Sequence, residues 1–534
     1  MVRPRTSASR RLLALAAVGV LVLGACSSPA ASSAPETGDT LRIAFGASMT
    51  TPDPAIFYEN EGLNVIQALY EGLLQYAPNT PENPTTAEVK INPLLAKDFS
   101  ISNDGLKYTF HLRDGVKFHD GTVMDAASVQ ASFERFKNVG AGPSYMLADV
   151  ASYETPDSGT FVVNLNQPVN PFVDFLASPY GPKVMSPTAI KAHEVSGDLA
   201  QEWIKTHSAG TGAFLIASWS TSEYKLAAFP DYWGDKSQFK NVDIKIIPSF
   251  QTQQLQLQQG TLDILINGVL PRDVSQLESK GLKTFVFDQP TLDTWWINTG
   301  AGPFADARIR AALASAIDRK SIVDQVFQDT GTLAKTLAPG ATLPSGTDTY
   351  NPTYNPQLLK DLVAQLPASG RKVSIAYATQ DPVNQQIADL VQEQLSQIGF
   401  DATARAVPVD ELFTWPTNPE LRSDLMVQNS IGDGASPYTW YSLFYAKTGG
   451  LNWLGADVCD AADKITDQAY RTALPEAAAQ TYVQADQAYA ECGAFLPIAD
   501  TKGIMAYRSN LTGLVHPYAS QTSLLLNEVR SVAP

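Results

Sequence analysis

The stretch from Arg371 to Ala406 constrains the fold more than any other part of the chain. Its first segment, VSIAYA, is typical of a buried β-strand, and Asp381-Pro382 then supplies an N-cap and a first-turn proline for a helix. Apolar residues recur at helical spacing up to Gly399, at Val383, Ile387, Leu390, Val391, Leu395 and Ile398. FDATARA follows as a second strand. This β-α-β unit predicts at least one lobe built of α/β layers.

Other segments have the same mixed character. We predict strands at Leu41–Phe45, Tyr108–Leu112 and Thr160–Leu165, a helix whose apolar face carries Val65, Ile66, Leu69 and Leu73, and a second helix from Ala305 to about Val326. With 534 residues, the chain is long enough to divide into more than one lobe.

The N-terminus has the pattern of an export signal. Four arginines, Arg3, Arg5, Arg10 and Arg11, precede an apolar or small run from Leu12 to Leu23 that is short for a membrane span. The next residues, Leu23-Gly24-Ala25-Cys26, resemble a bacterial lipobox, in which the cysteine is lipidated and anchors the protein to the membrane. We therefore predict a signal peptide at 1–25 and a flexible tether, rich in Ser, Ala and Pro, at 26–40. The alternative is a secreted protein in which Cys26 has no special role.

Three cysteines occur in the sequence, and lipidation of Cys26 leaves Cys459 and Cys492 as a pair. Outside the cell such a pair favours a disulfide over two buried free thiols.

The charge of the chain excludes one class of partner. The formal net charge is −16, and removal of the four leader arginines makes it more negative. Phosphate repulsion would oppose nucleic-acid binding by such a surface. Nothing after Leu23 is long and apolar enough to span a bilayer, so we expect the rest of the chain to be extracytoplasmic.

Polar residues cluster in FHLRDGVKFHDG, Phe110 to Gly121, but their pattern indicates scaffold. Alternation in YTFHL puts Tyr, Phe and Leu on one strand face, and both Asp-Gly pairs are turn signals. His111 and His119 would supply only part of a zinc ligand set. The sequence contains no G-x-S-x-G elbow, phosphate-binding loop, H-E-x-x-H or C-x-x-C motif. We expect no catalytic residues, no cofactor and no metal site.

The stretch SNDGLKYTFHLRDGVKFHDGTVMDAASVQASFERF resembles the signature of the family 5 extracellular solute-binding proteins of ABC transporters, which bind dipeptides, oligopeptides or nickel. Further blocks resemble that family in the same order along the chain: ALYEGLLQY, NPLLAKDF, GTGAFLIASW, FPDYWG and WWINTGAGPFADARIRAALASAIDRKSIV.

The resemblance implies a periplasmic-binding-protein-like α/β fold of the type II cluster. It has two lobes joined by a hinge, and an extra subdomain is inserted in the first lobe. The expected boundaries are 41–84, 209–288 and 505–534 for lobe I, 85–208 for the inserted subdomain and 289–504 for lobe II.

The resemblance also implies a ligand site in the cleft. Family peptide binders carry a segment like G-W-x-x-D-x-x-[DE]-P, whose first Asp pairs with the peptide α-amine. In NSIGDGASPYTW, Asp433 occupies that position, Ser430 replaces the tryptophan, and Ser436 replaces the second acid. Val427 stands where oligopeptide binders commonly have an arginine. Asp433 is otherwise a turn residue between glycines.

Two further segments are expected to line the cleft. Trp295 and Trp296 precede Asn298 at a strand end, and because neighbours on a strand point to opposite faces, at most one tryptophan faces the ligand. The loop residues predicted to line the cleft are Ser48, Met49 and Thr50.

These expectations together describe a non-enzymatic, monomeric substrate-binding lipoprotein on the outer face of the cytoplasmic membrane. It would capture a small solute, above all a peptide, and deliver it to an ABC permease. The alternatives are a non-peptide cargo such as an oligosaccharide, opine or metal chelate, or an extracellular hydrolase or sensor on a similar scaffold.

Overall fold

A computed structural model describes residues 38–59, 61–86, 88–379, 381–521 and 523–532. The predicted signal peptide, Cys26 and most of the predicted tether lie outside these ranges. Within them, no helix has the length and apolarity needed to cross a membrane.

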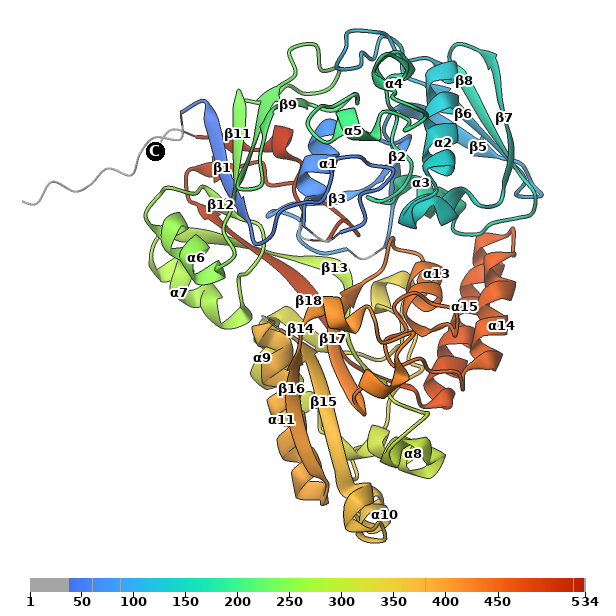
Figure 1. Ribbon diagram of the computed structural model, residues 1–534, viewed down its shortest axis with the longest axis vertical. Helices are drawn as coiled ribbons and strands as arrows, with labels where there is room; N and C mark the ends of the chain where they lie inside the picture. Colours follow the sequence, from blue (N-terminus) through green and yellow to red (C-terminus); the bar gives the residue numbers. More distant parts are fainter. Residues whose placement is uncertain (1–37, 60, 87, 380, 522, 533–534) are drawn as a thin grey trace, which may run out of the picture. The chain divides into compact units, whose positions relative to one another are not determined.

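An 11-stranded mixed sheet is the main element of the described chain (Figure 1). Two long antiparallel strands lie at its middle, β13 (Leu282–Ile297) and β18 (Phe495–Arg508). On one side of them follow β17 (Leu425–Ile431), β15 (Lys372–Ala378) and β16 (Asp401–Val407). On the other side follow β12 (Ile264–Leu265), β1 (Thr40–Phe45), β11 (Asn241–Ile246), β10 (Glu223–Ala228) and β9 (Phe214–Trp219). β14 (Gly331–Leu333) pairs with β18 outside this order.

Each half of the sheet packs into its own hydrophobic core, and we name the two parts accordingly. Lobe I surrounds the core that contains β1, β9, β10 and β11, and lobe II surrounds the core that contains β15, β16 and β17. β13 contributes Phe285 and Phe287 to the first core and Leu292 and Trp295 to the second. The chain therefore has the predicted two-lobe α/β fold, and β13 and β18 cross between the lobes. The residue boundaries of lobes and subdomain stay a prediction.

Lobe I includes a second, four-stranded sheet in the order β5 (Ala96–Ile101), β6 (Lys107–Leu112), β8 (Thr160–Leu165), β7 (Val150–Asp157). Helix α2 (Ala126–Val139) packs on it. The expected alternation in β6 is confirmed, because Tyr108, Phe110 and Leu112 are buried. His111 bonds Asp98 on the neighbouring strand, and His119 bonds Ser208 and the carbonyl of Gly212.

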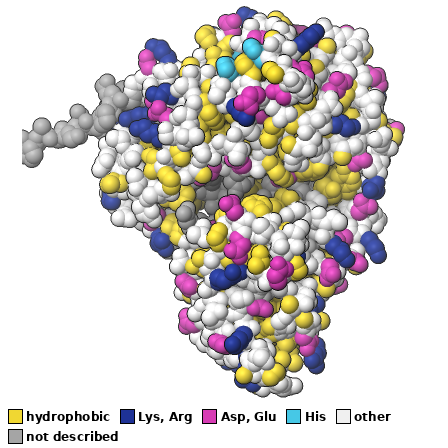
Figure 2. All heavy atoms as spheres, viewed as in Figure 1, with side chains coloured by type: hydrophobic (Ala, Val, Ile, Leu, Met, Phe, Trp, Pro, Cys, Tyr) yellow, Lys and Arg dark blue, Asp and Glu magenta, His cyan; other side chains and the backbone are white. Residues whose placement is uncertain are grey.

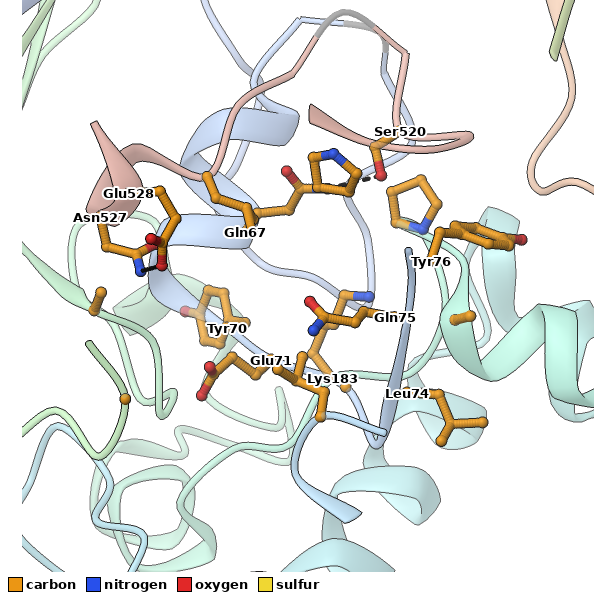
Figure 3. Close-up of a pocket in the computed structure, with 18 of the residues that line it drawn as sticks. Gln67, Tyr70, Glu71, Leu74, Gln75, Tyr76, Lys183, Ser520, Asn527 and Glu528 are labelled. Carbon is orange, nitrogen blue, oxygen red and sulfur yellow. Dashed lines mark hydrogen bonds between the residues drawn. The ribbon is translucent and has the colours of Figure 1, made fainter. Parts of the chain in front are cut away.

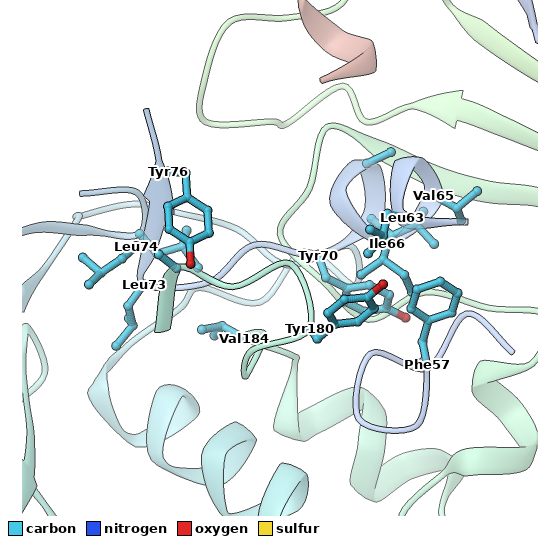
Figure 4. Packing of buried hydrophobic residues seen from close by; sticks show 14 of the residues in the cluster. Phe57, Leu63, Val65, Ile66, Tyr70, Leu73, Leu74, Tyr76, Tyr180 and Val184 are labelled. Carbon is cyan, nitrogen blue, oxygen red and sulfur yellow. The ribbon is translucent and has the colours of Figure 1, made fainter. Parts of the chain in front are cut away.

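Helix α1 (Leu63–Leu69) is buried along nearly its whole length in lobe I. Figure 4 shows its side chains Leu63 and Ile66 beside Phe57 and Tyr180. The helix is shorter than the predicted one, because Tyr70 already has an extended backbone. Leu73 is nevertheless buried in the same core.

The predicted β-α-β unit of lobe II is confirmed. β15 and β16 are parallel, and α11 (Pro382–Ile398) connects them. The Asp381 side chain accepts from the amides of Val383 and Asn384, and Gly399 ends the helix with a φ of 115°.

The predicted helix from Ala305 to Val326 is wrong in one respect. The structure has two helices there, α8 (Ala307–Ala316) and α9 (Arg319–Val326). Ile317 is extended, and the Asp318 side chain accepts from the amide of Ser321, so it caps a new helix.

The remaining helices are short, apart from two antiparallel helices in lobe II, α14 (Asp460–Tyr470) and α15 (Pro475–Cys492). Cys459 and Cys492 are joined by a disulfide in the structure, with their Cα atoms 5.3 Å apart. The short helices are α3 (Phe172–Ala177), α4 (Pro187–His193), α5 (Gln201–Ile204), α6 (Phe250–Gln258), α7 (Val274–Ser279), α10 (Gln357–Ala364), α12 (Val409–Leu412) and α13 (Pro437–Trp440).

Candidate functional site

Lobe II reaches toward lobe I with the loop that follows β17, residues 432–436. Figure 2 shows a hollow between the upper and lower parts of the molecule in this view. The loop carries Asp433, which is only 4% exposed, although glycines flank it on both sides. A turn residue between glycines is ordinarily solvated. The burial of this carboxyl group is the first sign that the loop has a more specific role.

Three side chains from lobe I hold Asp433 in place. The hydroxyl groups of Tyr58 and Tyr145 donate to its Oδ2 atom, at 2.5 and 2.7 Å. Ser178 Oγ donates to its backbone carbonyl at 2.5 Å. Oδ1 accepts no hydrogen bond from a residue that the structure describes. One oxygen of the carboxylate is therefore fixed by protein donors, and the other has acceptor capacity to spare.

The electrostatic state of Asp433 follows from this setting. Burial raises the pKa of its carboxyl group to about 6, while the hydrogen bonds from Tyr58 and Tyr145 lower it. No Lys, Arg or His side chain of the described residues lies within ion-pair distance of it. A buried carboxylate with only neutral donors favours a positively charged group beside it.

A second contact fixes the loop one residue past Gly434. The amide of Ala435 donates to Tyr76 Oη and to Asp174 Oδ1, both at 3.0 Å, and Tyr76 Oη donates to Asp174 Oδ1 at 2.5 Å. Burial raises the pKa of Asp174 to about 6. A Cβ atom on Gly434 would overlap Asp174 Oδ2, so this close approach requires glycine.

Aromatic rings surround the loop on the lobe I side. The ring of Tyr180 lies edge-on to that of Tyr58, with centroids 5.3 Å apart, and Phe175 contacts both Tyr145 and Tyr438. Such rings exclude water and strengthen the electrostatic interactions of Asp433.

The predicted residues at the end of β13, and Asn298 directly after it, lie inside lobe II. Trp295 and Trp296 are fully buried, and Trp296 Nε1 donates to the carbonyl of Phe444. Asn298 bonds the carbonyl of Ser423 and the amide of Gly300. The hydrogen bonds described do not link these residues to the Asp433 loop, and their contact with a ligand stays a prediction.

The other predicted residues are divided between two places. Ser436 belongs to the Asp433 loop, where its side chain accepts from the amide of Tyr438 and caps α13. Ser48, Met49 and Thr50 lie in the loop after β1. Met49 is buried, and its backbone amide donates to Tyr224 Oη. Thr50 bonds Glu59, and Ser48 is exposed. Their contact with a ligand also stays a prediction.

Sequence reasoning missed the residues of lobe I that contact Asp433. Tyr58, Tyr145 and Ser178 are far from Asp433 in the chain and belong to no motif. The one available signal was weak: Tyr58 and Tyr145 are aromatic residues with a polar group in segments that also contain proline.

The chain resembles a family of known proteins along most of its length. Residues 90–452 match the family described as "Bacterial extracellular solute-binding proteins, family 5 Middle". One relative is the "Probable D,D-dipeptide-binding periplasmic protein DdpA" of Escherichia coli K12, which is 28% identical over 425 residues, or 76% of this chain and 77% of that protein. Another is the "Glutathione-binding protein GsiB" of Salmonella typhimurium, which is 25% identical and covers 92% and 94% of the two chains.

Solved structures show the same fold at lower identity. The binding protein DppA of Helicobacter pylori, in complex with the peptide STSA, aligns with a TM-score of 0.77 at 22% identity over 92% of this chain and 98% of that one. NikA of Brucella suis, in complex with Fe(III)-EDTA, aligns with a TM-score of 0.78 at 18% identity over 92% and 99%. The fold prediction is thereby confirmed.

Proposed function

Because the chain belongs to family 5 of the bacterial extracellular solute-binding proteins, we propose that it captures a peptide between its two lobes and delivers it to an ABC permease. The observation that carries the proposal is Asp433, a buried carboxyl group with hydroxyl donors on Oδ2 and no cation of the described chain beside it. The α-amine of a peptide supplies the missing positive charge. Relatives named for binding D,D-dipeptides and glutathione support this class of cargo.

Capture depends on both lobes. The peptide ammonium donates to Asp433 Oδ1, while Tyr58 and Tyr145 of lobe I keep Oδ2 in place. A ligand that contacts groups of both lobes stabilises their closed arrangement relative to an open one. Burial makes any unmatched polar group of a wrong ligand costly, which gives the cleft its selectivity. The role is binding, without chemical turnover.

Transport requires the protein to stay near its permease. We propose that a lipid on Cys26, attached when residues 1–25 are removed, anchors it to the membrane. The anchored protein acts as a monomer outside the cytoplasmic membrane. A Cys26→Ala variant is expected to appear in the culture medium, whereas the unaltered chain stays in the membrane fraction. Equal membrane retention of both would contradict the lipid anchor.

Native mass spectrometry on the chain from Ser27 onward, purified without denaturation, tests the cargo. We expect a bound species that fragments as a peptide and that is absent from the Asp433→Ala variant. A bound opine, sugar or chelate would be consistent with the transport role but would mean that the cargo is not a peptide. Neighbours solved with Fe(III)-EDTA and agropinic acid make this the alternative to be examined. Cleavage of an added peptide into products would support the alternative that the protein is an extracellular hydrolase.

A further inference from the structure

Lobe I contains a cavity of about 390 Å³ that is separate from the Asp433 carboxylate (Figure 3). Its walls come from the end of α1, from β2 (Leu74–Tyr76), from residues 177–183 and 232–235, and from the described residues 517–520 and 525–528. Protein pockets for small molecules commonly have this size. Aromatic and proline side chains supply apolar surface, so the question is what its polar groups would bind.

The most unusual of these groups is Lys183. This residue is 7% exposed, and its Nζ atom donates to the carbonyl of Ser178 at 2.8 Å. Among the described residues, no carboxylate lies within ion-pair distance of it. Burial lowers the pKa of the Lys183 amine to about 7. Buried ammonium groups are normally paired, so Lys183 offers two unused N–H donors to a carboxylate.

A neighbouring amide extends this donor site. In Figure 3 the Gln75 side chain lies next to Lys183 in the middle of the cavity. It makes no hydrogen bond to a residue that the structure describes. The amide therefore has both a donor and an acceptor for a ligand.

Acidic groups occupy a different side of the cavity. Figure 3 shows Glu71 and Glu528 to the left of Lys183. Glu71 is already bonded by Thr211, Tyr232 and Trp233. Glu528 is half-buried and accepts from Asn527, and Asp235 also lines the cavity. An anion would meet repulsion from these acids, and a simple cation would meet repulsion from Lys183.

We propose that this cavity is a second binding site, for a zwitterion of amino-acid size. The ligand carboxylate pairs with Lys183 and accepts from the Gln75 amide. Its ammonium group lies toward Glu528 and Asp235. This arrangement compensates the buried lysine and turns the ligand ammonium group toward the side of the cavity that carries the carboxyl groups.

The cavity also contacts the residues that hold the Asp433 loop. Lys183 bonds Ser178, whose hydroxyl group bonds the carbonyl of Asp433. Tyr76 lines the cavity, and its hydroxyl group accepts from the amide of Ala435. If the proposed transport function holds, an occupant of the cavity stabilises the contact between the lobes and strengthens peptide binding.

Calorimetric titration with three matched probes tests the site: L-alanine, which has both charges, propionate, which has the carboxylate alone, and L-alaninamide, which has the ammonium alone. We expect L-alanine to bind at least tenfold more tightly than either other probe. Lys183→Met should weaken L-alanine binding at least tenfold, and Gln75→Leu should weaken it less. Melting temperatures of both variants establish that they fold.

An Asp433→Asn variant separates this cavity from the peptide site, because L-alanine also carries an amine. We expect this variant to lose peptide binding and to keep L-alanine binding within about twofold. The opposite pattern would be loss of L-alanine binding in Asp433→Asn and unchanged L-alanine binding in Lys183→Met. It would mean that L-alanine binds at Asp433 between the lobes, and it would overturn the inference. Failure of L-alanine and the larger L-leucine to bind the unaltered chain would overturn it as well. Neither result affects the peptide proposal, which is measured separately in the same variants.

Discussion

At the scale of single residues, the charge of Asp433 should control peptide affinity. Asp433→Asn keeps a side-chain oxygen for the hydroxyl groups of Tyr58 and Tyr145 and removes the negative charge. Loss of one partner of a buried charge pair costs about 2 kcal/mol or more, so peptide binding should weaken roughly thirtyfold or more. Calorimetry measures this, with the exposed Asp324→Asn as control. Unchanged peptide affinity in Asp433→Asn would mean that this carboxylate does not bind the peptide amine.

The same carboxyl group should make peptide binding depend on pH. Because the pKa of Asp433 is raised to about 6, the group becomes protonated as the pH falls from 7 to 5 and then no longer attracts an ammonium group. We expect peptide affinity to fall over this range in the unaltered chain and to stay nearly flat in Asp433→Asn. A parallel fall in both would assign the dependence to another group, such as Asp174, whose pKa is also about 6.

The stability of the ligand-free protein should change in the opposite sense. In the unfolded chain an aspartate has a pKa of about 3.9, below that of folded Asp433. Between these values the folded state binds more protons, so the Asp433 contribution to the free energy of unfolding falls as the pH rises from about 4 to 6. Urea unfolding at several pH values should show a smaller fall for Asp433→Asn. An identical slope in both proteins would contradict the raised pKa.

At the scale of secondary-structure elements, the disulfide connects the start of α14 with the end of α15. Cys459 and Cys492 are separated by 33 positions, so the bridge restricts a sizeable loop of the unfolded chain. Replacing both with serine should lower the free energy of unfolding by about 2–4 kcal/mol. Urea unfolding with and without a reductant measures this: reductant should destabilise the unaltered chain alone. Insensitivity of the unaltered chain to reductant would mean that the thiols are free.

The elements also show where sequence reasoning succeeds. Strand β15, helix α11 and strand β16 were predictable, because Asp381 and Gly399 mark the helix ends locally and the apolar spacing is regular. The break between α8 and α9 was not, because apolar spacing continues through Ile317 and hides the cap at Asp318. Apolar periodicity reports which face is buried and is insensitive to a single extended residue.

The candidate site divides in the same way. Asp433 was a candidate from the sequence, because it stands in a short segment that resembles a family motif, and its contact with a ligand stays a prediction. Tyr58 and Tyr145, which lie 375 and 288 positions away in sequence, were not. Contacts over such separations depend on how lobe I folds, and no local pattern encodes them. The burial that raises the pKa of Asp433 is likewise a property of the folded molecule alone.

At the scale of the whole described molecule, few hydrogen bonds connect the lobes beyond the continuous strands β13 and β18. They include the contacts of the Asp433 loop and a second group, in which Tyr470 Oη donates to Asp149 Oδ2 at 2.6 Å and the amide of Asn170 donates to the carbonyl of Tyr470. Ala435 and Tyr470 also pack in the core of lobe I. Contacts between the domains of one chain permit relative motion unless they are large and hydrophobic. The ligand therefore has a large share in determining how often the lobes are closed.

Removal of the Tyr58 and Tyr145 hydroxyl groups should shift the equilibrium between the open and closed arrangements of the lobes. In a Tyr58→Phe, Tyr145→Phe double variant both rings stay, and the carboxyl group of Asp433 loses its two donors from lobe I, while Ser178 still bonds the backbone carbonyl. Hydrogen bonds to a charged group contribute about 1.5–3 kcal/mol each, so the closed arrangement should become less populated. We expect small-angle X-ray scattering to give a larger radius of gyration for the ligand-free variant than for the unaltered chain. Saturating peptide should reduce the difference, at a higher peptide concentration than the unaltered chain needs.

A Tyr354→Phe variant is a suitable control, because this tyrosine is exposed in lobe II and forms no hydrogen bond to a described residue. It should scatter as the unaltered chain does. If the double variant also scatters in that way and binds peptide with unchanged affinity, the hydroxyl groups do not contribute to closure. In that case the remaining contacts would hold the lobes together. These are the bond from Ser178 to the Asp433 carbonyl, the bonds from the Ala435 amide to Tyr76 and Asp174, and the contacts of Asn170 and Asp149 with Tyr470.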